Sequence, residues 1–339
     1  MSLLSVSDLS VEFATRDGVV SAVNAVSFEV SPGQVLALLG ESGSGKSVTL
    51  RSILGLHPPG RTRVGGEVRL KGHDVNRLDE RARRELRGGV VAMVFQEPMT
   101  ALDPVYTIGR QIEETLVQHR GHNRAAARRR ARDLLDLVQV PSPERCLTSY
   151  PHELSGGMRQ RAMIAIALAC EPELLLADEP TTALDVTVQA QILWLLRDLQ
   201  RRLGLAVIFV THDLGVAAEI ADDAAVMYGG RIVEQAPVRE LFRAPAHPYT
   251  EGLMLATVRR GQKGRALVPI PGAPPNLAAL PPGCAFAARC PHVKPVCIET
   301  APALHLVASG HVSRCHLVPE RLGPSLAALA PSLTQGGSP

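Results

Sequence analysis

The sequence predicts an α/β fold with a parallel β-sheet at its centre. Four short apolar runs, each long enough for one buried strand, cover residues 35–39, 90–95, 174–177 and 205–210. Helical segments follow them, and polar residues stand where each run ends. Strands that alternate with helices pair in parallel, and ligands bind at the carboxyl ends of such strands. We therefore expect the chemistry of this protein at that edge of the sheet.

The composition sets limits on size, location and partners. A chain of 339 residues allows one large domain with an appendage, or two domains. The net charge of +3 is too small to indicate nucleic acid by itself. No apolar run approaches the ~18 residues of a membrane span, and residues 1–5 do not begin a signal peptide. We expect a cytosolic protein, attached peripherally if it serves a membrane process.

The N-terminal part of the chain predicts antiparallel β-structure beside this core. Residues 4–7, 9–13 and 25–30 alternate apolar and polar side chains, as short strands do. Residues 66–72 have the pattern of a hairpin. An antiparallel β-region is therefore expected to precede most of the α/β core.

The middle of the chain predicts a helical insertion between two halves of the core. Residues 108–121 and 124–140 are both helical in period. Further helices are expected at residues 158–169 and 188–203, and a hairpin is expected at residues 225–234.

The first apolar run leads into a loop with the features of a phosphate-binding loop. Gly43 and Gly45 allow tight turns, so that successive backbone N–H groups can point at one anion. The helix expected to begin near Lys46 adds its dipole, Lys46 a mobile charge, and Ser47 a hydroxyl for Mg²⁺. A glycine-rich turn that binds nothing is the alternative. The candidate residues are Gly40, Glu41, Ser42, Gly43, Ser44, Gly45, Lys46, Ser47 and Val48.

Polar residues at the ends of the other three runs suit a nucleoside triphosphate. Asp178 can hold Mg²⁺, directly or through water, and Glu179 can polarise an attacking water. His212 could donate to a γ-phosphate, and Gln96 could ligate Mg²⁺ or position water. Taken singly, each has a structural alternative: a solvated turn carboxylate, a satisfied histidine or an ordinary glutamine.

A second candidate anion site precedes the helix expected from Met158. Ser155 can cap that helix, and Gly156 and Gly157 leave its first N–H groups open to a ligand. An ordinary N-cap without a ligand is the alternative, and it is the more common case.

The motifs as a set resemble the nucleotide-binding subunits of ABC transporters, over about residues 3–240. All six motifs of that family occur here in the family's order. They are Walker A (40–47), the Q-loop (Gln96), the signature (Leu154, Ser155, Gly156, Gly157, Met158 and Gln160), Walker B (174–179), the D-loop (183–185, with Asp185) and the switch histidine (His212). The resemblance implies a P-loop NTPase cassette with a parallel-sheet core, an antiparallel β-subdomain and a helical subdomain at about residues 97–170.

The resemblance also implies roles in ATP hydrolysis. Lys46 and the loop amides would bind the β- and γ-phosphates, and Glu179 would act as the catalytic base with His212 at the γ-phosphate. Ser47, Gln96 and Asp178 would ligate Mg²⁺. Phe13, just before the glycine turn at residues 17–18, is the candidate for the aromatic side chain that stacks on adenine.

In ABC proteins the signature of one subunit closes on the ATP held by another. One cassette in this chain therefore implies a second ABC ATPase subunit, expected to be a homologous partner in a heterodimer. The family further implies two integral membrane permease subunits, reached through the segment around residues 102–112, and indirectly a substrate-binding protein. It places the chain at the cytoplasmic face of the membrane.

The C-terminal part narrows the resemblance to the importers of dipeptides, oligopeptides and nickel. Residues 247–253, 269–272, 283–286 and 289–291 resemble the C-terminal extension of those ATPases. We expect the nucleotide-binding domain at residues 1–258, the extension at 259–320 and a flexible tail at 321–339.

Four of the six cysteines lie in this extension. Cys284, Cys290, Cys297 and Cys315 are separated by five, six and seventeen residues, which is not the spacing of a zinc ribbon. Four thiolates could hold a [4Fe–4S] cluster, and the resemblance implies such a cluster at these cysteines. Zinc and unligated cysteines are the alternatives. Cys146 and Cys170 are interpreted as packing residues.

The sequence thus predicts an ATP-binding and ATP-hydrolysing subunit that energises the import of di- and oligopeptides. The same importer family with nickel, glutathione or an opine-like compound as cargo is one alternative. A soluble ABC ATPase of DNA repair or translation is the other.

Overall fold

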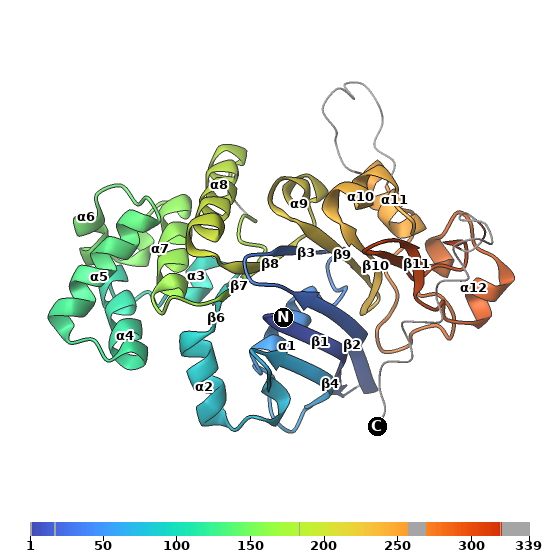
Figure 1. The fold of residues 1–339 in the computed structure, drawn as a ribbon, viewed down its shortest axis with the longest axis horizontal. Coiled ribbons are helices and arrows are strands. Elements are labelled where there is room, and N and C mark those ends of the chain that lie inside the picture. Colours follow the sequence, from blue (N-terminus) through green and yellow to red (C-terminus); the bar gives the residue numbers. More distant parts are fainter. Residues whose placement is uncertain (1, 17, 183, 257–268, 319, 321–339) are drawn as a thin grey trace.

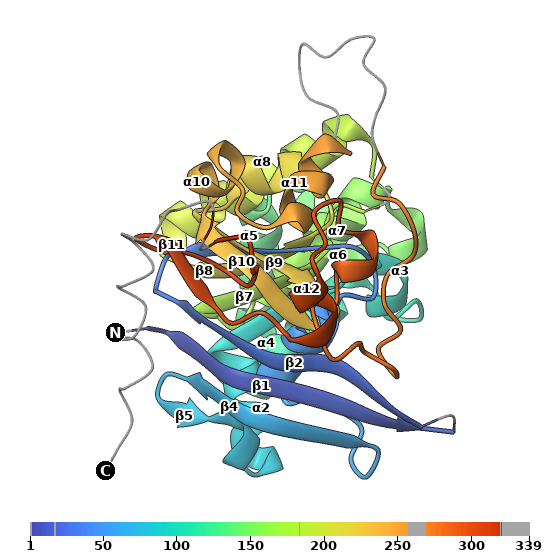
Figure 2. The same cartoon turned by 90° about the vertical axis from the view of Figure 1, so that its right-hand side faces the viewer.

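The computed structural model describes residues 2–16, 18–182, 184–256, 269–318 and 320. Two β-sheets form its centre, with helices around them (Figure 1). The larger sheet has the strand order β11-β12-β10-β9-β3-β8-β7-β6, and the smaller has the order β2-β1-β4-β5. Figure 2 shows the smaller sheet lying beneath the larger one.

The four apolar runs form neighbouring strands of the larger sheet, as predicted. β3 (Val35–Leu39), β8 (Ala206–Thr211), β7 (Leu174–Asp178) and β6 (Val91–Val94) pair in parallel in that order. β9 (Asp223–Tyr228) pairs in parallel on the other side of β3, and β10 (Arg231–Pro237) is antiparallel to β9.

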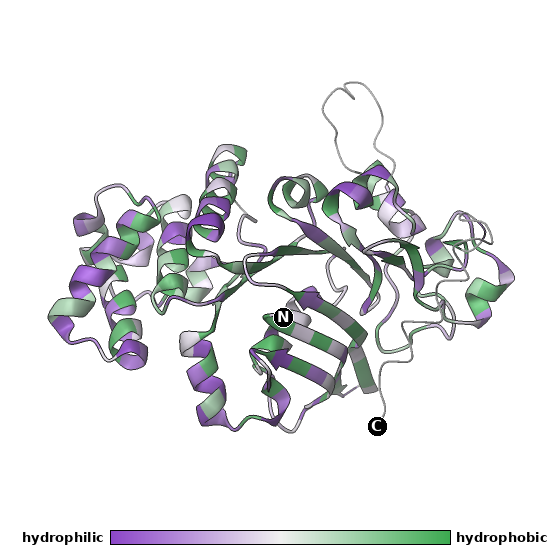
Figure 3. Ribbon diagram, viewed as in Figure 1, coloured by the Kyte–Doolittle hydropathy of each residue, from purple (hydrophilic) through white to green (hydrophobic). Residues whose placement is uncertain are grey.

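Burial on both faces explains why these strands are apolar without alternation. In β3, Val35, Ala37 and Leu39 face one core, which is shared with the helices. Leu36 and Leu38 face the other core, which is shared with the smaller sheet. Figure 3 colours the strands of the larger sheet as mostly hydrophobic, whereas the helices mix hydrophobic and hydrophilic residues.

The smaller sheet is antiparallel, as predicted, but it contains longer strands than expected. Its members are β1 (Leu4–Thr15), β2 (Gly18–Val30), β4 (Thr62–Leu70) and β5 (His73–Asp74). The prediction of separate strands at residues 4–7 and 9–13 is wrong, because both lie in β1. Asp8 has a φ of 49° where the pairing register shifts, so a bulge absorbs the break in the alternation.

The helical insertion between β6 and β7 is confirmed. It occupies one end of the molecule (green in Figure 1). Side chains of Thr107, Asn123 and Ser155 cap three of its helices. Its elements are α3 (Pro98–Ala101), α4 (Ile108–Arg120), α5 (Arg124–Leu137), α6 (Pro143–Thr148), η2 (Pro151–Glu153) and α7 (Gly156–Leu168).

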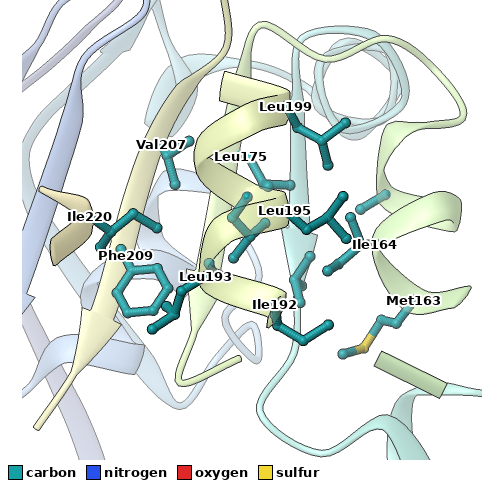
Figure 4. Packing of buried hydrophobic residues seen from close by; sticks show 14 of the residues in the cluster. Met163, Ile164, Leu175, Ile192, Leu193, Leu195, Leu199, Val207, Phe209 and Ile220 are labelled. Carbon is teal, nitrogen blue, oxygen red and sulfur yellow. The ribbon is translucent and has the colours of Figure 1, made fainter. Parts of the chain in front are cut away.

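The remaining helices cover the sheets. α8 (Val186–Leu203) packs Leu193, Leu195 and Leu199 among strand and helix residues that include Leu175 and Ile164 (Figure 4). These helices are α1 (Lys46–Ile53), η1 (Val75–Arg77), α2 (Glu80–Gly89), α8 (Val186–Leu203), α9 (Leu214–Ile220), α10 (Val238–Arg243) and α11 (Pro248–Leu255). None of the helices in the described ranges is both long and apolar enough to span a membrane.

The described C-terminal residues are attached to the cassette by a sheet extension and by a core contact. They contain η3 (Ala287–Arg289), α12 (Pro295–Glu299), β11 (His305–Ala308) and β12 (His311–Ser313). β12 pairs with β10, and buried His311 lies 2.7 Å from Glu234 of β10. Phe286 joins the helix-side core. The limits at 258 and 320 stay predictions, and residues 257–268 and 321–339 lie outside the described ranges.

Candidate functional site

The phosphate loop connects β3 to α1 in a conformation that requires glycine at two positions. Gly40 has a φ of +147°, and a Cβ there would lie 2.3 Å from the carbonyl oxygen of Met227. Gly45 has a φ of +104°, and its Cβ would lie 2.6 Å from the carbonyl oxygen of Ala22. The sequence pattern thus reflects close backbone approach as well as tight turning.

Lys46 lies within its own loop. Its Nζ donates to the carbonyl oxygens of Gly40 (2.8 Å) and Glu41 (2.9 Å), and it lies 3.4 Å from Ser44 Oγ. Burial lowers the pKa of Lys46, while the charges of Glu179, Asp178 and Glu41 oppose that shift. The loop therefore holds an ammonium group whose oxygen partners can be exchanged for phosphate oxygens.

Ser47 and Asp178 form the pair that the sequence predicted for Mg²⁺. Ser47 Oγ donates to Asp178 Oδ1 at 3.0 Å, and Asp178 is only 5% exposed at the end of β7. Burial raises the pKa of Asp178, against the hydrogen bond from Ser47. A buried carboxylate beside a hydroxyl offers the hard oxygen donors that Mg²⁺ prefers, so these residues fit the ion.

Gln96, Glu179 and His212 meet at the carboxyl ends of three parallel strands. Glu179 Oε2 accepts a hydrogen bond from Gln96 Nε2 at 3.2 Å and lies 3.4 Å from His212 Nδ1. Thr182 Oγ1 donates to the same oxygen at 2.9 Å. Glu179 has a φ of 46°, an uncommon conformation that is found more often at functional sites. The expected convergence is present, while ligation of Mg²⁺ by Gln96 stays a prediction.

The signature residues form an ordinary capped helix start in this structure. Ser155 caps α7 and accepts from the N–H of Met158 at 3.4 Å, while Leu154 and Gln160 are buried. A Cβ at Gly157 would lie 2.7 Å from a methyl group of Val188 in α8, so glycine lets these helices approach.

The structure describes only part of the predicted D-loop. Asp185 caps α8 and accepts from the N–H of Val188 at 2.9 Å. Residue 183 of this motif lies outside the described ranges.

Phe13 lies in β1 with its ring edge-to-face to His57, at 5.8 Å between centroids. The ring is half-buried beside the smaller sheet's core. Its stacking on adenine stays a prediction.

Two residues from the C-terminal half were missed as contacts of the phosphate loop. Arg289 pairs with the Glu41 side chain, and Tyr249 OH accepts from the Glu41 N–H at 2.9 Å. Both residues stand in segments whose family resemblance was noted, but no local pattern indicates which loop they would contact.

The four C-terminal cysteines gather around Cys284 without forming a site for a metal ion. Burial raises the pKa of the Cys284 thiol to about 11, against a backbone hydrogen bond at Phe286. The charges of the other three cysteines raise it further, and the N–H of Cys284 donates to the carbonyl oxygen of Cys297 at 2.7 Å. No group of three or more His, Cys, Asp or Glu side chains in the described part of the chain is arranged to hold a metal ion. The described residues therefore offer no site for a single ion such as zinc at these cysteines, and the [4Fe–4S] cluster stays a prediction.

Cys146 and Cys170 are buried in the helical part, which agrees with packing roles.

The fold and the site define a phosphate-loop ATPase with the arrangement of an ATP-binding cassette. The profile of the family described as "ABC transporter" matches residues 23–182. A second profile, "Oligopeptide/dipeptide transporter, C-terminal region", matches residues 233–297. A third, "AAA domain, putative AbiEii toxin, Type IV TA system", matches residues 147–218, inside the cassette.

Relatives and solved structures agree with these matches. The chain is 54% identical over 316 residues to a probable peptide ABC transporter ATP-binding protein, y4tR, of Sinorhizobium fredii, covering 92% of this chain and 94% of that protein. It is 48% identical over 320 residues to the dipeptide transport ATP-binding protein DppD of Bacillus subtilis, covering 94% and 96%. The dimeric cassette MJ0796, solved with ADP and Pi, has a TM-score of 0.63 at 30% identity and covers 70% of this chain and 99% of its own.

The chain therefore belongs to the ABC transporter ATP-binding proteins of the oligopeptide/dipeptide transporter type. Its activity is ATP hydrolysis coupled to transport. As an importer subunit of this family it works with membrane permease subunits, at the cytoplasmic face of the membrane. The resemblance noted in the sequence is confirmed.

Proposed function

We propose that this subunit energises the import of di- and oligopeptides. The observation that carries the proposal is the union, in one chain, of an ATPase cassette with a C-terminal region of the oligopeptide/dipeptide transporter type. The names of the relatives, which refer to peptide and dipeptide transport, support it. Nickel, glutathione or opine-like cargo and a soluble ATPase are the less favoured functions.

The geometry supports a division of labour during hydrolysis. Lys46 exchanges its loop carbonyl partners for the β- and γ-phosphates of ATP. Ser47 and Asp178 would hold Mg²⁺, which supplies positive charge to the phosphate oxygens. Glu179 Oε2 orients the attacking water and accepts its proton, while His212 donates to the γ-phosphate. Gln96, which donates a hydrogen bond to Glu179, links the hydrolysis site to the segment that follows Gln96 in the chain.

That segment is the proposed contact with the permeases. Met99, Val105 and Tyr106 follow Gln96 and expose large apolar side chains, of which Val105 is 68% exposed. Exposed apolar side chains this close together suit a protein interface. A change in the hydrogen bond between Gln96 and Glu179 would move this segment when ATP is hydrolysed.

A second cassette is proposed to complete the ATP site. The phosphate loop and the Ser155 cap begin helices in different parts of the fold, α1 below the central sheet and α7 in the helical insertion (Figure 1). MJ0796 was solved as a dimer. We propose that the partner is a homologous ATPase, so that each signature serves the nucleotide of the other subunit.

We also propose a [4Fe–4S] cluster at Cys284, Cys290, Cys297 and Cys315. A cluster holds its four thiolates farther apart than a single ion does, which is compatible with thiols that gather without forming a single-ion site. The N–H of His292 donates to Cys290 Sγ at 3.4 Å, and such bonds stabilise thiolate ligands.

Two experiments test these proposals. The chain is assembled with its permeases and binding protein in liposomes, and accumulation of a labelled tripeptide is measured with ATP inside. Uptake of nickel or glutathione instead of peptide would overturn the cargo assignment. The absence of any membrane subunit in native purifications would overturn the transporter assignment.

For the cluster, anaerobically purified protein should contain iron and acid-labile sulfide in equal amounts, and both should be lost in Cys284→Ser. Zinc without sulfide would refute it.

A further inference from the structure

One arginine of the C-terminal region reaches into the phosphate loop. Arg289 ends η3, and its side chain is only 5% exposed. Its Nη1 donates to Glu41 Oε2 at 2.7 Å and its Nη2 to Glu41 Oε1 at 3.0 Å. The pair is therefore bidentate, the geometry in which an arginine orients a carboxylate most firmly.

The Arg289 guanidinium is itself held in place. Its Nε donates to the carbonyl oxygen of Pro271 at 2.8 Å, and Nη2 also lies 3.3 Å from that of Ile270. Nη1 lies 3.3 Å from Tyr228 OH, and the group lies 5.8 Å from the centre of the Tyr228 ring. All three nitrogens of the fork have acceptors, so the group has little freedom to turn away from Glu41.

Glu41 is anchored at three points. Besides its carboxylate, its N–H donates to Tyr249 OH, and its carbonyl oxygen accepts from Lys46 Nζ. Tyr249 is fully buried and packs against Phe286 of the C-terminal region, at 5.4 Å between ring centroids. The loop conformation is therefore tied to residues that enter the fold after the cassette's own motifs.

The pair also meets an electrostatic need. Glu41 puts a negative charge into the loop that must receive a triphosphate, and this charge acts on Lys46. The buried Arg289 guanidinium offsets it at hydrogen-bonding distance. Without that partner, the carboxylate would repel the incoming phosphates and could turn toward Lys46.

We propose that Arg289 is a positioning residue for ATP binding, which fixes Glu41 and neutralises its charge so that the phosphate loop is ready for the triphosphate. It acts through Glu41 and does not take part in the chemical step. The inference concerns the ATP site of this subunit and holds whatever the cargo is.

The test compares variants in the assembled transporter, with Mg-ATP as the probe. Arg289→Met should raise the KM for ATP about ten- to a hundredfold, because the partly buried Glu41 carboxylate loses its charged partner, and should change kcat by less than about twofold. Adding Glu41→Gln to that variant should restore most of the affinity, because the unpaired charge is gone. Arg289→Lys, which keeps the charge but loses the fork, should fall between.

Arg243→Met is the matched control, since Arg243 makes an exposed ion pair with Glu240 and should leave KM unchanged. Thermal unfolding of each variant shows whether it is folded. If Arg289→Met does not fold, the same comparison of KM values is made between Arg289→Lys and the double variant Arg289→Lys/Glu41→Gln. A KM within twofold of the parent in the folded Arg289 variant would overturn the proposal. So would a double variant that binds ATP no better than the single one, because that result would assign Arg289 a structural role only.

Discussion

Glu179→Gln tests whether the Glu179 carboxylate acts as the catalytic base. The substitution keeps the shape of the side chain and an oxygen that can accept from Gln96 and Thr182, so the local fold should persist. It removes the only group among Gln96, Glu179 and His212 that carries a negative charge and can accept a proton from water. A positioned general base contributes about 10²–10⁴-fold, which corresponds to about 3–5 kcal/mol in the activation barrier.

We therefore expect turnover of the assembled transporter to fall by at least about a hundredfold. ATP should bind as well as before or better, because the lost charge faced the phosphates. The variant should accumulate as a closed, ATP-bound dimer of cassettes, which is measured by nucleotide retention and light scattering after gel filtration.

Glu173→Gln is the matched control for this variant. Glu173 lies just before β7, where it makes an exposed ion pair with Lys71, and its loss should cost at most about 1 kcal/mol of stability. Its turnover should equal that of the parent protein. If Glu179→Gln turned over within about threefold of the parent, the assignment of Glu179 as the base would be wrong.

Three further predictions concern stability and reactivity. Gly40→Ala should lower the free energy of unfolding by about 3 kcal/mol or more, whereas Gly60→Ala should lower it by about 1 kcal/mol. Both glycines have a positive φ, but only a Cβ at Gly40 would meet a backbone oxygen. Equal losses in urea titrations would contradict this. Cys146, whose pKa burial raises to about 11, should resist alkylation at pH 7 until the protein is unfolded, as mass spectrometry can show. Its contribution to stability, complete below about pH 9, should be lost as the pH rises toward 11. Glu234→Ala should lower the free energy of unfolding by about 3 kcal/mol or more, because two buried backbone N–H groups and a buried histidine lose their acceptor. Glu240→Ala, at an exposed ion pair, should lower it by less than about 1 kcal/mol. Similar Tm values for these two variants would refute the buried network.

The cassette was predictable because its signals are local. The strand, the loop and the helix around Lys46 follow one another directly in the chain. The apolar run of the strand and the spacing of the glycines in the loop therefore suffice to place them. Gln96 and Glu179 are 83 residues apart, yet their meeting followed from the rule that parallel strands bring their carboxyl ends to one edge. The break in alternation at Asp8 was misinterpreted, because a bulge can continue a strand through a residue that disrupts its period.

The attachment of the C-terminal region could not be derived in this way. β12 has only three residues, too few for a periodic signal, and its pairing with β10 depends on the sheet edge that β10 presents. The four cysteines were identified by spacing and resemblance, but spacing does not give the distances between sulfur atoms. These contacts are decided by packing between segments far apart in the chain.

The sequence by itself determined the chemistry of the phosphate loop, the carboxylates after β7 and the family to which the chain belongs, because these depend on short runs of residues. Only the tertiary structure placed Arg289 on Glu41, across 248 positions of sequence. Arginine and glutamate are ordinary surface residues, and no periodicity marks which of them will be buried together. Their pairing arises from the way η3 and α11 pack over the loop, and it connects the C-terminal region to the ATP site.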